Sequence, residues 1–67
     1  MPVVLRQIEE AVLRWTHRRI WNLRVEFVAG KVILRGETDS FYSKSLAQQG
    51  VRELHPEIGL KNAISVA

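Results

Sequence analysis

The clearest pattern along the chain is an alternation of apolar and polar residues over residues 23–36, LRVEFVAGKVILRG. This period of two predicts two short β-strands, and the A-G pair between them predicts a two-residue hairpin loop. In that register Phe27 lies opposite Val32, and Val25 lies opposite Leu34. All the apolar side chains of the hairpin then share one face, which needs a cover. They are Leu23, Val25, Phe27, Val32 and Leu34.

The other face of the predicted hairpin is basic and aliphatic. Arg24 lies directly opposite Arg35, and like charges across a strand pair are unfavourable. Glu26 is diagonal to both Lys31 and Arg35, so we expect it to neutralise part of this cluster. Ala29 is an unusual loop residue, because a type I′ turn requires positive φ there and Asn, Asp or Gly usually provides it.

An amphipathic helix is predicted before the hairpin, from apolar residues at helical spacing. They are Val4, Leu5, Ile8, Ala11, Val12 and Trp15. We expect His17, Arg18 and Arg19 in its last turn, where cations suit the negative end of the helix dipole. Ile20 and Trp21 fall off the stripe, which predicts that they pack over the junction between helix and strand. Trp21 is equally suited to be an interfacial anchor beside the arginines.

A second amphipathic helix is predicted after the hairpin. Asp39 or Ser40 is expected to cap its N-terminus, and His55-Pro56 to stop it. Its inward stripe consists of small and aliphatic residues, namely Ser43, Leu46, Ala47, Gly50, Val51 and Leu54. Gly50 is unfavourable inside a helix, so its place in this stripe suggests that another segment passes close by.

Phe41 departs from the stripe of this second helix. It projects to the polar side beside Lys44, with Tyr42 on the flank of the apolar stripe. An aromatic residue in the first turn of a helix either folds back onto a strand end or serves recognition. The sequence leaves both alternatives open, with the first favoured.

A third strand is predicted over residues 60–67, where apolar and polar residues alternate again. Gly36 is expected to end the second strand. A right-handed crossover through the second helix would place the third strand parallel to the second in the same sheet. The predicted fold class is therefore α+β, in the order αββαβ, with a three-stranded mixed sheet and two helices packed on one face. The other face of the sheet would remain open.

Length and composition indicate one small domain over residues 1–67. The chain has 46% hydrophobic and 25% charged residues, as ordinary globular proteins do, and no cysteine. Its apolar runs are far too short for a signal peptide or a membrane span. The chain as given is expected in the cytoplasm, where it would be peripheral to a membrane. If it is an excerpt of a longer protein, the cell envelope is expected instead.

Charge is unevenly distributed along the chain. Residues 1–35 hold seven Lys/Arg against three Glu, and residues 36–67 hold three against four Asp/Glu. The two sums, +4 and −1, predict an electropositive side that suits an anionic surface. Helix solvation alone explains part of the same pattern, so a merely solvated basic face remains an alternative.

Several segments together resemble the BON domain. They are LRVEFVAGKVILRG with Gly30 and Gly36, the polar cap at Asp39-Ser40, the helix around Leu46, Ala47 and Val51, and NAISV with Asn62, Ile64 and Val66. The resemblance covers essentially the whole chain and implies an αββαβ fold. It also implies a non-enzymatic module that associates with phospholipid membranes or partner proteins, often in bacterial cell envelopes.

The expected function is therefore binding to a membrane surface. The candidate residues for lipid or anion binding are Arg14, Arg18, Arg19, Trp21, Arg24, Lys31, Arg35, Phe41 and Lys44. The expected partner is an anionic phospholipid surface or an envelope protein. The alternative is a protein interaction or oligomerisation module that uses the open sheet face, with a homo-oligomer among its outcomes.

The sequence gives little support to nucleic-acid binding, catalysis or metal binding. The glycines form no GXXG loop and the strands carry no aromatic pair, so nucleic-acid binding is not expected. No nucleophile stands at a recognisable spacing from a base and an acid, and neither histidine has partners at ligand spacing. We therefore expect no catalytic residues, no metal and no cofactor.

Overall fold

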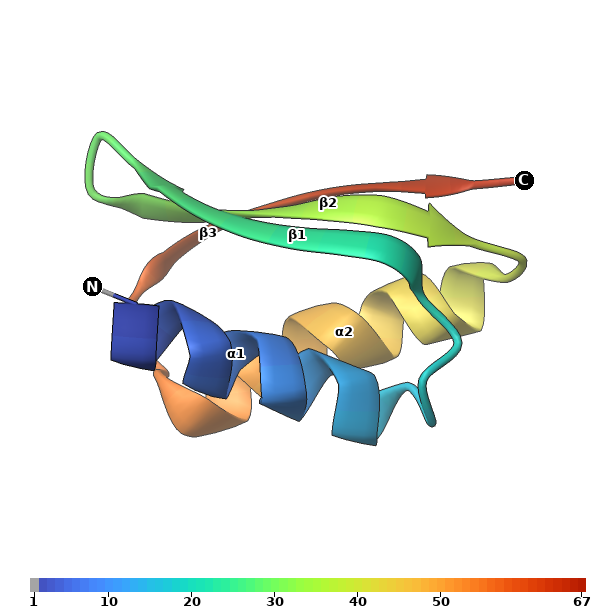
Figure 1. Ribbon diagram of the computed structural model, residues 1–67, viewed down its shortest axis with the longest axis horizontal. Helices are drawn as coiled ribbons and strands as arrows, with labels where there is room; N and C mark the ends of the chain where they lie inside the picture. The colour runs from blue at the N-terminus through green and yellow to red at the C-terminus, as the bar shows by residue number, and fades with distance from the viewer. Residues whose placement is uncertain (1) are drawn as a thin grey trace.

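The computed structural model describes residues 2–67, which form two helices on one side of a three-stranded sheet (Figure 1). The elements are α1 (Pro2–Trp15), β1 (Trp21–Val28), β2 (Lys31–Thr38), α2 (Phe41–Leu54) and β3 (Gly59–Val66). The fold is α+β, and the predicted order of elements is confirmed.

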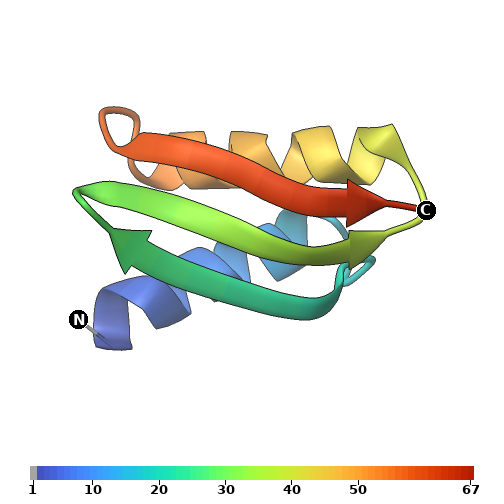
Figure 2. The same cartoon turned by 90° about the horizontal axis from the view of Figure 1, so that it is seen from above.

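The sheet is mixed and has one uncovered face. β2 is central, antiparallel to β1 and parallel to β3. α1 lies beneath β1 and α2 lies beneath β3 (Figures 1 and 2). Because both helices pack on the same side, the predicted open face of the sheet is present.

The hairpin has the register that the alternation predicted. Phe27 pairs with Val32 and Val25 with Leu34. The loop residue Ala29 has φ 51° and Gly30 has φ 78°, as the two central positions of a type I′ turn require. The pattern of side chains and the turn therefore agree on one register.

The strand ends differ from those that the sequence predicted. β1 begins at Trp21 rather than Leu23, and its register shifts between Trp21 and Arg24. β2 continues past Gly36 to Thr38, because residues 37 and 38 find parallel partners on β3. β3 begins and ends one residue earlier than predicted. Pairing with a distant strand, rather than local composition, sets these ends.

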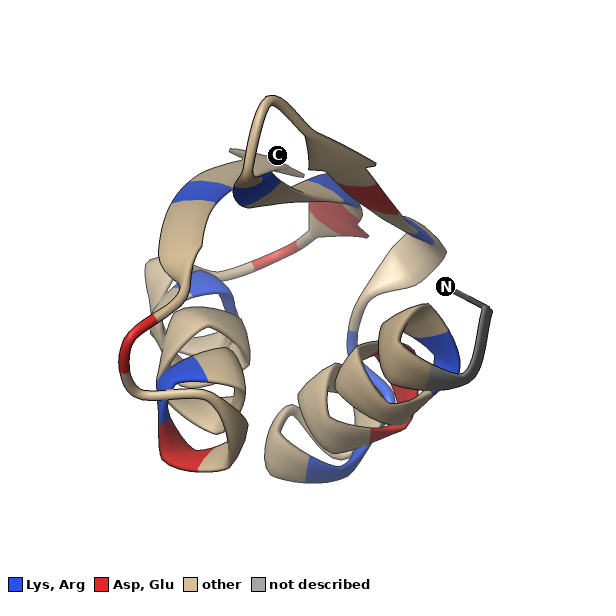
Figure 3. Ribbon diagram, turned by 90° about the vertical axis from the view of Figure 1, so that its left-hand side faces the viewer, with Lys and Arg blue, Asp and Glu red and all other residues tan. Residues whose placement is uncertain are grey.

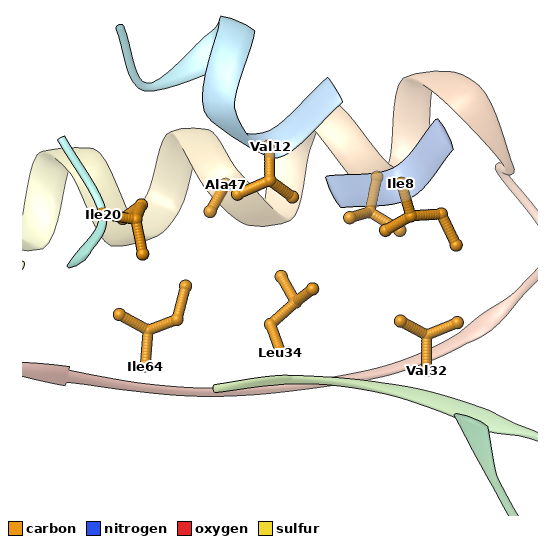
Figure 4. Packing of buried hydrophobic residues seen from close by; sticks show 8 residues of the cluster. Ile8, Val12, Ile20, Val32, Leu34, Ala47 and Ile64 are labelled. Atoms are coloured by element: carbon orange, nitrogen blue, oxygen red, sulfur yellow. The ribbon is translucent and has the colours of Figure 1, made fainter. Parts of the chain in front are cut away.

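One hydrophobic core lies between the sheet and the helices. Its buried members are Ile8, Val12, Ile20, Val32, Leu34, Ala47, Val51 and Ile64. Figure 4 shows Val32, Leu34 and Ile64 pointing from the sheet toward the side chains of the helical layer. The outermost apolar residues of the two predicted stripes, Val4 and Leu54, are exposed. The core thus uses the middle of each helix.

The end of α1 corrects one prediction. The helix stops at Trp15, so His17, Arg18 and Arg19 lie outside its last turn. The Arg18 N–H donates to the Leu13 carbonyl at 2.7 Å, and the His17 N–H donates to the carbonyl three residues before it at 3.2 Å. These two bonds form a Schellman motif, in which His17 holds a left-handed φ of 54°.

The helix α2 begins and ends where its sequence predicts. The Ser40 side chain accepts from the Ser43 N–H, which identifies Ser40 as the N-cap, and His55 is the C-cap. A Cβ built on Gly50 would lie 2.9 Å from two ring atoms of Trp15. The predicted close approach at Gly50 is therefore confirmed, and the approaching segment is α1.

Candidate functional site

The uncovered side of the sheet, called here the open face, is the candidate site. β1 contributes Trp21, Arg24, Glu26 and Val28, β2 contributes Lys31, Ile33, Arg35 and Glu37, and β3 contributes Lys61, Ala63 and Ser65. Seen from the hairpin end, blue and red segments lie side by side on the strands above the two helices (Figure 3). Most of these side chains are exposed, so they are available to a partner.

The open face carries more positive than negative charge. It has four Lys/Arg and two Glu, which gives a net charge of +2. The Nε of Arg35 donates to Oε1 of Glu26 at 2.9 Å. The prediction that Glu26 neutralises part of the cluster is confirmed for Arg35. Since both side chains are about half exposed, this pair contributes little to stability.

A polar hollow of about 390 Å³ lies on the open face beside Arg24 and Arg35. These two arginines are directly paired across β1 and β2, and the small side chain of Ala63 follows next in the same row on β3. The hollow is lined by Asn22, Arg24, Arg35, Gly36, Glu37, Ala63 and Ser65. Among the residues described, Arg24 has no acidic partner within 4.0 Å. The hollow therefore offers the unpaired guanidinium of Arg24 beside the terminal nitrogens of Arg35, whose Nε is bound to Glu26.

Trp21 stands at the end of the open face that is far from the hairpin turn. It pairs with Glu37 and is 51% exposed, so it does not pack over the helix junction as predicted. Ile20, its neighbour, does so and is buried. The adjacent residues of an extended chain point to opposite sides, which explains why only one of the two enters the core.

The other candidate cations lie away from the open face. Arg14 is in the last turn of α1, and Arg18 and Arg19 follow in the segment that leads to β1. A nitrogen of Arg19 lies 3.9 Å from Asp39 Oδ2 in an exposed pair. The structure thus brings Arg24, Lys31 and Arg35 together with Trp21 on the open face. It leaves Arg14, Arg18 and Arg19 on the side of the helices.

The two α2 candidates also lie outside the open face. Phe41 is 73% exposed and does not fold back onto a strand end, contrary to the favoured prediction. Tyr42 is similarly exposed. Lys44 is half-buried, and its carbonyl accepts from the Asn62 side chain at 2.8 Å. The set of nine predicted residues is therefore not one surface.

Lys61 is a member of the open face that the list of candidates missed. Its parallel partner is Ile33, so its side chain stands in the row that also contains Glu26. The alternation of the third strand already places Lys61 on the side opposite Ile64, and this signal was enough to include it.

A second, apolar hollow of about 250 Å³ lies near the hairpin turn, on the side of the helices. It is lined by Val4, Leu5, Ile8, Phe27, Val32 and Ile58. Phe27 faces the helical layer as predicted but remains 56% exposed. The edge of β1 therefore keeps an exposed apolar ring at Phe27, although α1 lines part of this hollow.

Two further properties concern metals and membrane spans. Within residues 2–67, no three His, Cys, Asp or Glu side chains gather where they could hold a metal ion. Neither helix of that range has the length and apolar character needed to cross a bilayer.

The chain was compared with family models, curated proteins and solved structures. No family model, curated protein or solved structure matches the chain. The resemblance to the BON domain consequently remains a prediction.

Proposed function

We propose that this domain is a non-catalytic module that binds the surface of an anionic phospholipid membrane through its open face. The observation that carries the proposal is the pairing of Arg24 with Arg35 beside a polar hollow on an uncovered sheet. The resemblance to the BON domain points to the same function.

The hollow suits a phosphate group because its lining holds two guanidinium groups, Arg24 and Arg35, against the single carboxylate of Glu37. Guanidinium groups bind phosphate oxygens through strong, charge-assisted hydrogen bonds. Arg35 uses its Nε for Glu26, which leaves its terminal nitrogens for a ligand. A phosphate between Arg24 and Arg35 would also relieve the repulsion between them. The Ser65 hydroxyl lines the same hollow and adds a neutral donor.

Trp21 supplies the apolar part of the proposed contact. Tryptophan is enriched at the interface of membranes, where its ring lies among the headgroups. Its position at one end of the open face allows ring insertion while the arginines meet phosphates. The domain would then lie peripherally on the bilayer, with the helices turned away from it.

Vesicle co-sedimentation tests the proposal. The protein should pellet with vesicles of phosphatidylserine and phosphatidylcholine, and stay in solution with phosphatidylcholine alone. The double variant Arg24→Gln/Arg35→Gln should bind about thirtyfold more weakly, because each basic residue at the surface contributes about 1 kcal/mol. Glutamine keeps a polar donor, so the thermal melt should change little.

The matched control is Arg14→Gln/Arg18→Gln, which removes the same charge from the side of the helices. It should weaken binding by no more than about threefold, since charges on the far side are screened. An equal loss in both variants would show that the open face is not the contact. Absence of wild-type binding at low salt would refute the proposal.

A protein partner on the same open face is the second candidate. Val28 is exposed and Ile33 half-buried among charges of both signs, a mixture that also suits a protein surface. Wild-type protein that ignores anionic vesicles, but whose complex with a protein is broken by Arg24→Gln/Arg35→Gln, would favour this candidate.

A further inference from the structure

The sheet has two outer strands, β1 and β3, and only one of them is protected. In the strand order β1-β2-β3, each outer strand has one side without a partner (Figure 2). Such an edge presents free N–H and C=O groups that can pair with another strand. Whether an edge is available depends on what lies along it.

The edge of β3 is blocked by Asn62. Its Nδ2 donates to the Lys44 carbonyl of α2 at 2.8 Å, and its Oδ1 accepts from the Ile64 N–H at 3.3 Å. Two paired strands leave no room between them for a side chain. The Ile64 N–H, which donates to the Asn62 side chain, must therefore point away from β2, at the outer edge of β3. Asn62 therefore occupies the place that a further strand would need.

The edge of β1 is free over residues 23–27. The Val28 carbonyl and the Lys31 N–H close the two-residue loop, so the backbone groups of Val28 point toward β2. Along an antiparallel strand, the backbone N–H and C=O groups of successive residues point alternately toward one neighbouring strand and away from it. The N–H and C=O groups of Leu23, Val25 and Phe27 consequently point outward, and the bulge before Arg24 limits the free ladder at its other end.

We propose that a second copy of this chain pairs with this edge, β1 against β1, antiparallel about a twofold axis through Val25. In this register Val25 exchanges backbone hydrogen bonds with the partner's Val25. Leu23 does so with the partner's Phe27, and Phe27 with the partner's Leu23. All outward backbone groups of residues 23–27 then find partners. The result is one continuous six-stranded sheet.

Charge complementarity on the open face selects this register. Here Arg24 lies opposite the partner's Glu26, and Glu26 lies opposite the partner's Arg24, in the closely spaced positions between hydrogen-bonded pairs. Shifting the axis by one residue along β1 places Arg24 against the partner's Arg24 or Glu26 against the partner's Glu26. Since Arg24 has no acidic partner of its own in the described chain, pairing gives it one. A guanidinium has five N–H donors, so Arg24 keeps others for a phosphate in the hollow.

The opposite side of the same edge is apolar. Phe27 is more than half exposed on that side, and Leu23 and Val25 are half-buried. Across the twofold axis, each Phe27 ring meets the partner's Leu23. The apolar surface that the helices leave uncovered in one chain would thus be covered by the second, while the two open faces lie side by side.

The test is a charge exchange read by molar mass. Sedimentation equilibrium without lipid should show wild-type protein approaching twice the monomer mass of 7.7 kDa as concentration rises toward about 1 mM. Arg24→Glu, or Glu26→Arg, should each weaken self-association by about tenfold or more, because the twofold axis repeats the like-charge contact. An equimolar mixture of these two variants should recover dimers, since both contacts again have opposite signs.

The matched control is Lys61→Glu, which makes the same charge change as Arg24→Glu but on the protected strand. It should dimerise like the wild type, and circular dichroism should show the native melt for every variant. A wild type that stays monomeric at about 1 mM overturns the proposal. So does a mixture of folded variants that stays monomeric, or a control that is as weak as Arg24→Glu. Because no lipid is present, these outcomes are independent of vesicle binding.

Discussion

Ala29 holds a left-handed backbone conformation that its Cβ disfavours. It has φ 51° at the first loop position of the hairpin, while Gly30 takes the second at φ 78°. For a residue with a Cβ, this region costs about 1–2 kcal/mol relative to the usual regions. The turn is therefore held by strand pairing on both sides rather than by its own preference.

Replacing Ala29 with glycine should stabilise the domain by up to about 1 kcal/mol, since glycine adopts this φ freely but loses more entropy on folding. Thermal melting of the variant should show a higher midpoint. Ala63→Gly, the same change within the extended strand β3, should instead lower it. A lower midpoint for Ala29→Gly would contradict the strain at the turn.

Thr38 shows how a single side chain joins distant segments. It is buried at the end of β2, and its hydroxyl donates to the Arg19 carbonyl at 2.8 Å. This bond ties the segment after α1 to the strand that precedes α2. The buried hydroxyl is thereby satisfied, as a polar group in the core requires.

At the scale of elements, the contact between α1 and α2 depends on Gly50. A Cβ at this position would lie 2.9 Å from the Cγ and Cδ1 atoms of Trp15. Both atoms lie close to the Trp15 backbone, so either the indole ring must turn or α1 must move. The absence of a side chain at Gly50 sets how closely the helices approach.

Gly50→Ala should therefore destabilise the domain by about 1 kcal/mol, the middle of a net range of about 0–2 kcal/mol. Overpacking of this kind costs about 1–3 kcal/mol, whereas the gain in helix propensity is about 1 kcal/mol. Urea unfolding would measure the change. Gln49→Ala, at an exposed position of the same helix, should lie within about 0.5 kcal/mol of the wild type. An unchanged or more stable Gly50→Ala would show that the helices have room to separate.

At the scale of the whole molecule, the basic residues divide between two sides. Arg24, Lys31, Arg35 and Lys61 stand on the open face, while the arginines that follow α1 lie on the side of the helices. A flat membrane can contact only one of these sides closely. The proposed lipid contact therefore depends on four of the ten Lys and Arg residues of the chain.

Binding to anionic vesicles should consequently weaken steeply as salt increases. The screening length falls from about 10 Å at 0.1 M to about 3 Å at 1 M, so exposed arginines lose most of their attraction. Co-sedimentation in rising sodium chloride, with circular dichroism as the check on folding, would measure this. Binding that persists at about 1 M salt would point to insertion of Trp21 as the main contribution instead.

The sequence by itself determined the elements and their order. The alternation around the hairpin, the helical stripes, the cap at Asp39 or Ser40 and the His55-Pro56 stop are all local signals, set by residues within one or two turns of each other. The same alternation placed Arg24, Lys31 and Arg35 on one face of the hairpin, which is the part of the candidate site that could be predicted.

Only the tertiary structure decided which of the remaining candidates share a surface. Trp21 stands on the open face because the register of β1 shifts between Trp21 and Arg24, and a regular alternation of apolar and polar residues does not predict such a shift. β2 continues to Thr38 because β3 pairs with it from far along the chain. Asn62 protects one edge only because α2 brings the Lys44 carbonyl within reach. Such contacts depend on the packing of distant segments, and no local pattern encodes them.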